Sequence, residues 1–312
     1  MRFPFQREVA TPDPRLVERL ATHVDRLASL IGPRHLLQPE GFFSGAAYVE
    51  QELAKLGDSV QRESYWAFDY EVANVFIERP GKSKPSEVVI VGAHYDTDLD
   101  TPGAADTASA VAMLIEIARL LSDCPCPRTI RYVSFACEEA PHFHMNTMGS
   151  KVHARACRER GEQVTAMVCL EMVGYYSDER GSQQVPRTIP KWLHWAFPRR
   201  GNFLAAVGNM HSLANVWTFR RGFKRASRFP LFSLALPEKI REIRLSDNSS
   251  FWDQGYPALM ITDTSFLRNP HYHLESDTPE TLDYRRLAQA TIGVAGGVAR
   301  LAGYRGRIGA KG

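Results

Sequence analysis

Runs of apolar residues alternate with helical patterns along most of the chain, and this order predicts the fold. Apolar stretches of strand length occur at residues 60–65, 72–77, 88–91, 129–137, 163–170 and 258–262. Apolar residues recur at helical spacing at residues 14–31, 43–56, 107–121, 149–160 and 280–301. Pro279 is expected in the first turn of the last of these helices. The alternation of strands and helices between residues 88 and 171 indicates a parallel sheet with helices on both faces.

We therefore predict an α/β protein, a three-layer α/β/α sandwich with a mixed, mostly parallel central sheet. A single domain is expected over residues 1–312, with an N-terminal helix within residues 1–34. Residues 175–245 are less regular and rich in proline, and they are expected to form a rim segment that shapes a substrate cleft. Within this segment a strand is expected at residues 203–207 and a helix at residues 212–221. Three aromatic residues of that segment are expected to serve packing rather than a substrate platform: Trp192, Trp195 and Phe197.

Composition narrows the function classes. A net charge of +3 without a block of Lys or Arg argues against nucleic-acid binding. No window approaches 18 apolar residues, so no membrane-spanning helix is expected. Charged residues interrupt every apolar stretch of residues 1–30, which predicts no signal peptide and a cytoplasmic location. The five cysteines, an odd number, fit a reducing compartment. The pattern favours no particular oligomeric state.

Polar residues follow the predicted strands at the points where these strands end. His94 follows the apolar run 88–91, and Asp106 lies where a Gly/Pro-rich turn meets a helix. Ligand sites of open α/β sheets gather at the carboxyl ends of strands. The later strands end in further candidates, which are Glu138, Glu139, Glu171, His271 and His273. The set of imidazoles and carboxylates predicts a site for zinc or a similar divalent ion.

The spacing of these residues suggests how such a site would be supported. The adjacent carboxylates of Glu138 and Glu139 would repel each other unless a cation lay beside them. Asp96 follows His94 by two residues and is expected to accept the second ring N–H, fixing the tautomer. His271 and His273 alternate on an extended segment, so they are expected to face opposite ways and to compete for one place.

Several longer motifs resemble the M28 family of zinc peptidases. They are GAHYDT (92–97), PGAADTASA (102–110), CEEAPHF (137–143), LEMVGYYSD (170–178), SDNSSFWDQGYPA (246–258) and NPHYHLESDTPETLD (269–283). The motifs stand in the family's order and cover about residues 35–300. The resemblance implies a zinc-dependent exopeptidase, an aminopeptidase that acts on a peptide or aminoacyl substrate with two zinc ions per chain. It places the metal ligands at His94, Asp106 (bridging), Glu139, Glu171 and His273.

The resemblance also implies catalytic roles. Glu138 would be the general base toward the attacking water, and Tyr272 would donate to the developing oxyanion. Three positions depart from the family pattern: Glu171 replaces a usual Asp, Ala105 a polar residue and Asn248 a frequent His. Two alternatives stay open. One is a single-zinc acyltransferase like the glutaminyl cyclases, with the metal held by Asp106, Glu139 and His273. The other is a non-catalytic binding module on the same fold.

Overall fold

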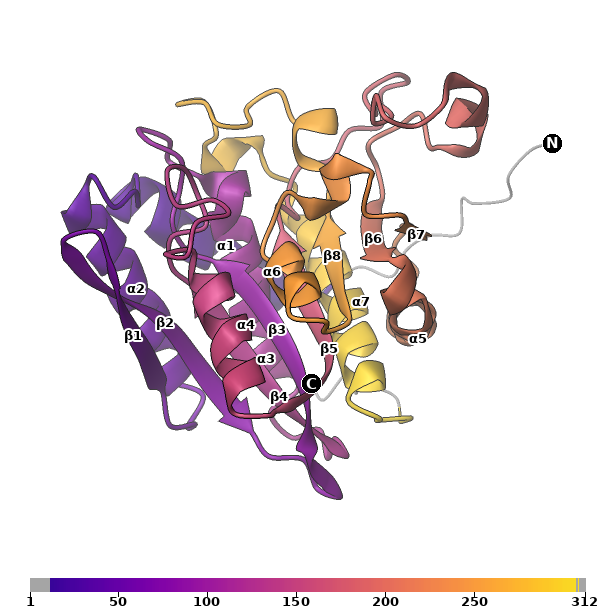
Figure 1. The fold of residues 1–312 in the computed structure, drawn as a ribbon. Helices are drawn as coiled ribbons and strands as arrows, with labels where there is room; N and C mark the ends of the chain where they lie inside the picture. Colours follow the sequence, from indigo (N-terminus) through magenta and orange to yellow (C-terminus); the bar gives the residue numbers. More distant parts are fainter. Residues whose placement is uncertain (1–11, 307, 309–312) are drawn as a thin grey trace.

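The computed structural model describes residues 12–306 and 308, and it is built around one eight-stranded sheet (Figure 1). Residues 1–11 of the predicted N-terminal segment lie outside the described part. The strands run in the order β1-β2-β4-β3-β5-β8-β6-β7 across the sheet. Their bounds are β1 (Gln61–Ala67), β2 (Tyr70–Arg79), β3 (Lys84–His94), β4 (Arg128–Phe135), β5 (Gln163–Glu171), β6 (Leu204–Asn209), β7 (Leu231–Leu236) and β8 (Ala258–Thr262).

Strand directions decide where a site can form. β4, β3, β5 and β8 are neighbours that run parallel, so their carboxyl ends meet at one edge of the sheet. β6 pairs with β8 in the antiparallel sense and with β7 in the parallel sense. β1 and β2 are antiparallel additions at the other side. The prediction of a mixed, mostly parallel sheet is confirmed.

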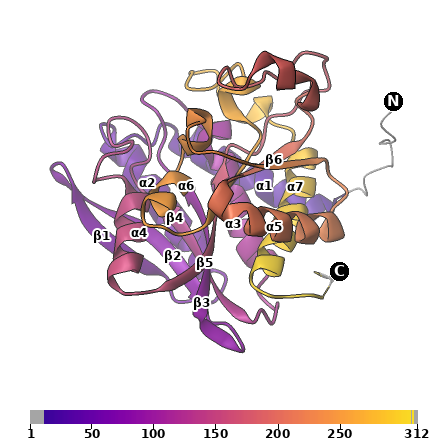
Figure 2. The ribbon, with the colours of Figure 1, turned by 45° about the vertical axis from the view of Figure 1, so that its right-hand side comes forward.

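Helices cover both faces of the sheet, and each face has its own core. On β3, Val89 and Val91 join one core while Val88 and Ile90 join the other, as the two-residue strand period requires. Figure 1 shows α4 and α6 in front of the sheet, and Figure 2 shows α5 beside α7. The first core is covered by α1 (Pro14–Asp25), α2 (Pro39–Ala54), α3 (Ser109–Leu120), α5 (Leu213–Ala226) and α7 (Tyr284–Leu301), and the second by α4 (Gly149–Glu159) and α6 (Asn248–Asp253). Within the residues described, no helix combines the length and apolar character needed to cross a bilayer.

Several helix starts differ from the sequence prediction, and α2 begins at Pro39 rather than at residue 43. Pro279 begins a separate one-turn helix (Pro279–Thr281), so its expected place in the first turn of α7 was wrong. α7 instead starts after Asp283, because this side chain accepts a hydrogen bond from the Arg286 N–H and so caps the helix. The helix expected from residue 107 begins only at Ser109, since residues 104–108 form an irregular turn.

The segment 175–245 contributes β6 and α5 at about the predicted places. It also contributes β7, a strand that the flanking Pro230 and Pro237 obscured in the sequence. The packing expected of its aromatic residues was wrong for Trp192 and Trp195, whose exposed fractions are 73% and 80%. Phe197 does pack, at 5.6 Å between its ring centroid and that of Phe232.

Candidate metal centre

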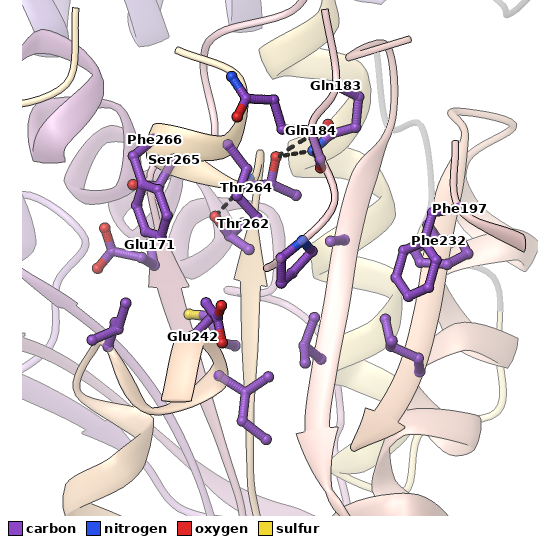
Figure 3. A pocket seen from close by; sticks show the side chains of 18 of the residues that line it. Glu171, Gln183, Gln184, Phe197, Phe232, Glu242, Thr262, Thr264, Ser265 and Phe266 are labelled. Atoms are coloured by element: carbon purple, nitrogen blue, oxygen red, sulfur yellow. Dashed lines mark hydrogen bonds between the residues drawn. The ribbon is translucent and has the colours of Figure 1, made fainter. Parts of the chain in front are cut away.

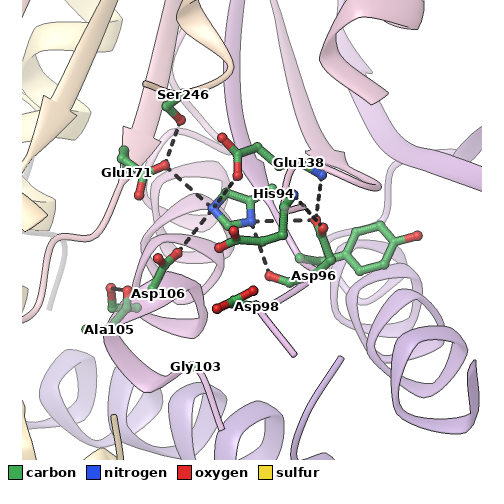
Figure 4. Close-up of polar contacts among 12 residues, drawn as sticks. His94, Asp96, Asp98, Gly103, Ala105, Asp106, Glu138, Glu171 and Ser246 are labelled. Atoms are coloured by element: carbon green, nitrogen blue, oxygen red, sulfur yellow. Dashed lines mark hydrogen bonds and ion pairs between the residues drawn. The ribbon is translucent and has the colours of Figure 1, made fainter. Parts of the chain in front are cut away.

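The residues predicted at strand ends meet at the edge where the four parallel strands end (Figure 4). His94 and Glu171 are the last residues of β3 and β5, and Glu138 and Glu139 follow β4. His273 comes from the loop after β8, and Asp106 from the irregular turn before α3. All of them are buried except His273, which is partly exposed. Five separate segments of the chain therefore supply this one cluster.

Asp106 lies between the two histidines and divides the cluster into two halves. Its Oδ1 lies 3.4 Å from His94 Nε2, and its Oδ2 lies 3.2 Å from His273 Nε2. The Glu171 carboxylate completes the first half at 3.5 Å from His94 Nε2, and the Glu139 carboxylate completes the second at 3.3 Å from His273 Nε2. Two ligands bound about 2.0–2.1 Å from one tetrahedral zinc ion would lie about 3.3 Å apart. The spacing of the donor atoms in each half matches that value.

Unpaired donor atoms provide an independent test of the fit to a metal. His94 Nε2, Asp106 Oδ1 and His273 Nε2 are buried and have no hydrogen-bond partner. Buried polar atoms are nearly always paired, so three unpaired atoms on the two sides of the Asp106 carboxylate need an explanation. A divalent cation on each side of Asp106 would satisfy all three atoms, and the residues present fit such ions.

The charges of the cluster are also incomplete without a cation. Burial is the main cause that raises the pKa of Glu138 well above its usual range; His94 opposes this rise, and Glu139, Glu171 and Asp247 add to it. Burial and the neighbouring Asp106 likewise raise the pKa of Glu139 to about 8, although His273 opposes this. A bound dication reverses such shifts because it stabilises the ionised carboxylates.

The two histidines show the complementary effect. Burial by itself would lower the pKa of His94, but Glu138 and the neighbouring carboxylates of Asp106, Asp96 and Glu171 raise this pKa well above its usual value. Burial opposes ionisation of His273 too, yet Asp106 and Glu139 raise its pKa to about 11. Perturbed pKa values of this kind, caused by burial together with specific charged neighbours, cluster at functional sites.

Asp96 supports the site chiefly because its carboxylate holds the backbone of Glu138 and Glu139. Its carboxylate accepts hydrogen bonds from the N–H groups of Glu138 at 3.0 Å and Glu139 at 2.9 Å. The acceptor nearest to His94 Nδ1 is the backbone carbonyl of Asp96 at 3.1 Å, while Asp96 Oδ1 lies at 3.5 Å. Residue 96 thus supports both His94 and the glutamate pair, and the role predicted for its carboxylate in fixing the imidazole tautomer stays a prediction.

Asp277 and Arg34 hold the turn that carries Asp106, and sequence reasoning did not assign them to the site. The Asp277 carboxylate accepts hydrogen bonds from the N–H groups of Ala105 at 2.9 Å and Asp106 at 3.0 Å. The buried guanidinium of Arg34 donates to the carbonyls of Pro102 at 2.9 Å and of the next residue at 3.0 Å. In the sequence Asp277 stood out only as one residue of the motif at 269–283, and no pattern marks Arg34.

Residues 246–248 supply another missed contact. The Ser246 hydroxyl donates to Glu171 Oε2 at 2.6 Å (Figure 4). Asp247 is fully buried and neither of its carboxylate oxygens has a hydrogen-bond partner; burial, with Glu171 and Asp96 nearby, raises its pKa to about 7 against the effect of His94. The sequence drew attention instead to Asn248, whose amide donates to the Ile243 carbonyl at 2.9 Å.

The loop after β8 separates the competing histidines. His271 Nδ1 lies 2.9 Å from the Ser276 hydroxyl and takes no part in the cluster. His273 faces Asp106, with its backbone in the left-handed region at φ 55°. The Tyr272 ring stacks on the His273 ring at 3.7 Å between centroids and also packs near Phe266. Tyr272 therefore lies directly beside the cluster.

Residues 74–296, which are most of the chain, match the sequence model of the family described as "Peptidase family M28". The chain belongs to peptidase family M28. This membership makes it a zinc metallopeptidase and a hydrolase, as the motifs predicted.

Individual relatives agree with the family. The M28 chain is 35% identical over 294 residues to the uncharacterized protein YfbL of Escherichia coli, covering 91% of this chain and 88% of YfbL. It is 27% identical to a probable zinc metalloprotease of the fungus Pyrenophora teres, over 81% of this chain but only 58% of the fungal protein's length.

Solved structures share the fold of this M28 chain. BSAP, a zinc aminopeptidase from Bacillus subtilis, superimposes with a TM-score of 0.69 at 16% identity, covering 94% of this chain and 95% of BSAP. A glutaminyl cyclase from Bacteroides thetaiotaomicron, bound to N-acetylhistamine, superimposes with a TM-score of 0.63 at 18% identity, over 94% and 99% of the two chains. At these identities the likeness establishes the fold alone.

Proposed function

We propose that this M28 peptidase is an aminopeptidase that uses two zinc ions and removes N-terminal residues from peptides. His94 and Glu171 would hold one ion, His273 and Glu139 the other, and Asp106 would bridge them. The observation that carries the proposal is the division of the cluster by Asp106, with one carboxylate oxygen directed to each histidine. Two such ions supply a polarised substrate carbonyl and a water of lowered pKa.

Glu138 is the general base of this proposal. Its carboxylate oxygen lies 3.9 Å from His94 Nε2, farther than the donors assigned to either ion. It therefore stays free to take the proton of the attacking water and to pass it to the leaving amine. The hydrogen bonds from the backbone of Glu138 and Glu139 to Asp96 fix the direction of both side chains. The Tyr272 hydroxyl is the group proposed to donate to the oxyanion.

A second candidate is a single-zinc acyltransferase of the glutaminyl cyclase type. The shared fold supports it, as does the half-site of Asp106, Glu139 and His273, which would hold one ion by itself. The complete second half-site of His94 and Glu171, however, favours two ions and hence the aminopeptidase.

Metal content and substrate hydrolysis test the proposal together. We expect two zinc ions per chain by elemental analysis and chelator-sensitive hydrolysis of aminoacyl-p-nitroanilides. Glu138→Ala should keep both ions and lower kcat by about 10²–10⁴, the usual contribution of a general base. The exposed Glu179→Ala serves as the matched control and should leave both quantities unchanged.

Other results would point elsewhere. One zinc ion with cyclisation of N-terminal glutaminyl peptides and no hydrolysis would establish the acyltransferase instead. Absence of zinc together with absence of turnover would leave a binding module. Full activity in Glu138→Ala would contradict the assignment of the general base.

A further inference from the structure

One segment of the chain carries an excess of positive charge that the net charge does not reveal. Residues 180–237 contain ten lysines and arginines and no aspartate or glutamate. These ten charges exceed the net charge of +3, so the rest of the chain is acidic overall. Within residues 12–306, none of the ten forms an ion pair with an acidic side chain. The basic residues therefore belong to one part of the fold, and no acid of that part neutralises them.

This segment lies at one end of the sheet, where β7 is the edge strand (Figure 1). Phe232 of β7 packs against Phe197, which belongs to a loop of residues 186–200 that we call the tryptophan loop (Figure 3). The next residue of β7, Ser233, accepts a hydrogen bond from Arg220 of α5 at 3.1 Å. Successive residues of a strand point to opposite faces, so the tryptophan loop and α5 flank the edge strand on its two sides.

The helix α5 presents a basic face to solvent. One side of the helix packs against α7 and is buried. The other side carries residues at helical spacing that are all exposed, namely Leu213, Trp217, Arg221 and Lys224. Partial burial and the neighbouring Arg220 lower the pKa of Lys224, which is the effect of like charges placed close together. The exposed face of α5 thus begins with apolar residues and continues with basic ones.

A cavity lined by arginines opens beside α5. It holds about 840 Å³ of space, part of it open to solvent, and no acid is among the described residues that line it. Its four arginines come from α5, from α7 and from the residues after α7: Arg221, Arg225, Arg300 and Arg305. A Cβ on Gly222 would lie only 2.2 Å from the Gly296 carbonyl oxygen. The missing side chain therefore lets α5 and α7 touch, and this contact brings arginines of both helices to one cavity.

The chemistry of this cavity fits a phosphate group. Guanidinium groups gathered around one space repel one another unless an anion lies among them. Each guanidinium offers parallel N–H donors that match two oxygens of a phosphate, and it keeps its charge at any physiological pH. A phosphate bound here would compensate the positive charge that no acid of the described chain compensates.

Large apolar side chains accompany the basic residues. Trp192 and Trp195 of the tryptophan loop are the most exposed of the large apolar residues described, at 73% and 80%, and Trp217 of α5 is 52% exposed. Met210 and Leu213, at the start of α5, are exposed as well. Tryptophan beside lysine and arginine is typical of surfaces that lie on a bilayer, where the rings enter the headgroup region and the basic groups attract anionic lipids. A free phosphate compound would use the arginines but not these apolar side chains.

We propose that this end of the molecule binds the surface of a membrane that contains anionic phospholipids. The arginine-lined cavity receives the phosphate of a lipid headgroup, and the three exposed tryptophans enter the interface between headgroups and acyl chains. The ten basic residues supply the long-range attraction to the negative surface. The proposal does not depend on the aminopeptidase function, because none of these side chains belongs to the metal centre.

Vesicle sedimentation tests the proposal with the full chain. The probes are vesicles of phosphatidylcholine alone and vesicles in which phosphatidylserine replaces part of it. We expect binding to the anionic vesicles that is at least about tenfold tighter than binding to the neutral ones, and that weakens as salt is raised. The tryptophan fluorescence should move to shorter wavelength on binding, because the rings leave water.

Two double variants separate the contributions of charge and apolar contact. Arg221→Gln/Arg225→Gln should weaken binding to anionic vesicles about 25-fold, or about fivefold for each charge removed near an anionic surface. Trp192→Ser/Trp195→Ser should weaken binding at least about tenfold and remove most of the fluorescence shift. The matched control is Arg15→Gln/Arg155→Gln, which removes the same charge from exposed positions of α1 and α4 and should bind within about threefold of the parent.

Every other outcome counts against the membrane surface. Absence of vesicle binding, equal binding to neutral vesicles, or equal weakening by the control pair would overturn the proposal. Binding of free glycerophosphate that Arg221→Gln/Arg225→Gln removes, without vesicle binding, would assign the cavity to a soluble phosphate compound instead. Binding of duplex DNA or formation of a dimer that the same variants abolish, again without vesicle binding, would assign this surface to a nucleic acid or to a second copy of the chain.

Discussion

Buried carboxylates occur at two places in this protein, and they differ in whether cationic side chains lie beside them. Glu116 of α3 is fully buried, and its carboxylate pairs with Arg19 of α1 at 2.8 Å and with Arg119 at 3.0 Å. Burial alone would raise the pKa of Glu116, but His23 and the two arginines bring it down to about 2. This carboxylate has its positive partners within the chain, and it joins α1 to α3.

The carboxylates at the edge of the sheet lack such partners. Glu138 and Glu139 lie among other acids, their pKa values are raised, and donor atoms beside them are unpaired. Burying a carboxylate without a cation is costly, and a chain keeps such an arrangement where an external positive ion completes it. Both kinds of carboxylate are buried, so burial does not distinguish them. The difference is that Glu116 is paired with cationic side chains of the protein, whereas the acids at the edge of the sheet need a bound cation.

Substitution of the central acid should have the largest effect. Asp106→Asn removes the charge shared by both half-sites, so we expect loss of zinc from the protein and a fall in kcat/KM of at least 10³. Elemental analysis and hydrolysis of an aminoacyl-p-nitroanilide measure the two quantities. Asp69→Asn, in the exposed turn between β1 and β2, is the matched control. Retention of two zinc ions by Asp106→Asn would show that Asp106 does not bridge them.

Substitution of the paired acid should affect stability instead. Glu116→Gln leaves Arg19 and Arg119 without their anion and should lower the free energy of unfolding by about 2 kcal/mol, a value reduced because both arginines are about one-third exposed. Urea unfolding measures this change, and kcat should stay within twofold. An unchanged midpoint with an unchanged slope would mean that the pairs contribute nothing.

The pairing of Glu116 with the two arginines also predicts how stability depends on pH. The pKa of Glu116 is depressed in the folded protein, so its contribution to stability is fully present above about pH 4.5 and is lost as pH falls toward 2. The difference in unfolding free energy between the parent protein and Glu116→Gln should therefore shrink as pH is lowered from 5 to 2.5. Urea midpoints at several pH values measure it, and a difference that grows at low pH would contradict the assignment.

A smaller effect is expected from the residue that orients Glu171. Ser246→Ala removes the hydrogen bond to Glu171 Oε2 and should weaken zinc binding about tenfold, the lower end of the range for groups that orient a metal ligand. Competition with a chelator measures the affinity. Ser249→Ala, three residues further on in α6 and with its buried hydroxyl unpaired, is the control and should bind zinc as the parent does.

Much of the fold could be predicted because apolar runs of strand length are visible in short stretches of sequence. The apolar run ending at His94 and those ending near Glu138 and Glu171 have strand length, and the carboxyl ends of parallel strands share one edge. That geometry placed the candidate ligands together before any contact was known. Prolines beside β7 hid that strand, and Asp283 starts α7 where Pro279 was expected to do so, because a side-chain cap outweighs the preference of proline.

The sequence by itself determined the layered α/β architecture, the family and the residue types available at the edge of the sheet. The tertiary structure alone decided that Asp277 and Arg34 hold the turn of Asp106, and that Glu171, Thr262, Ala205 and Phe232 are paired across four strands. These contacts join residues far apart in the chain, and their geometry depends on strand order and register. No local pattern encodes that order, because it results from packing the whole sheet between its helices.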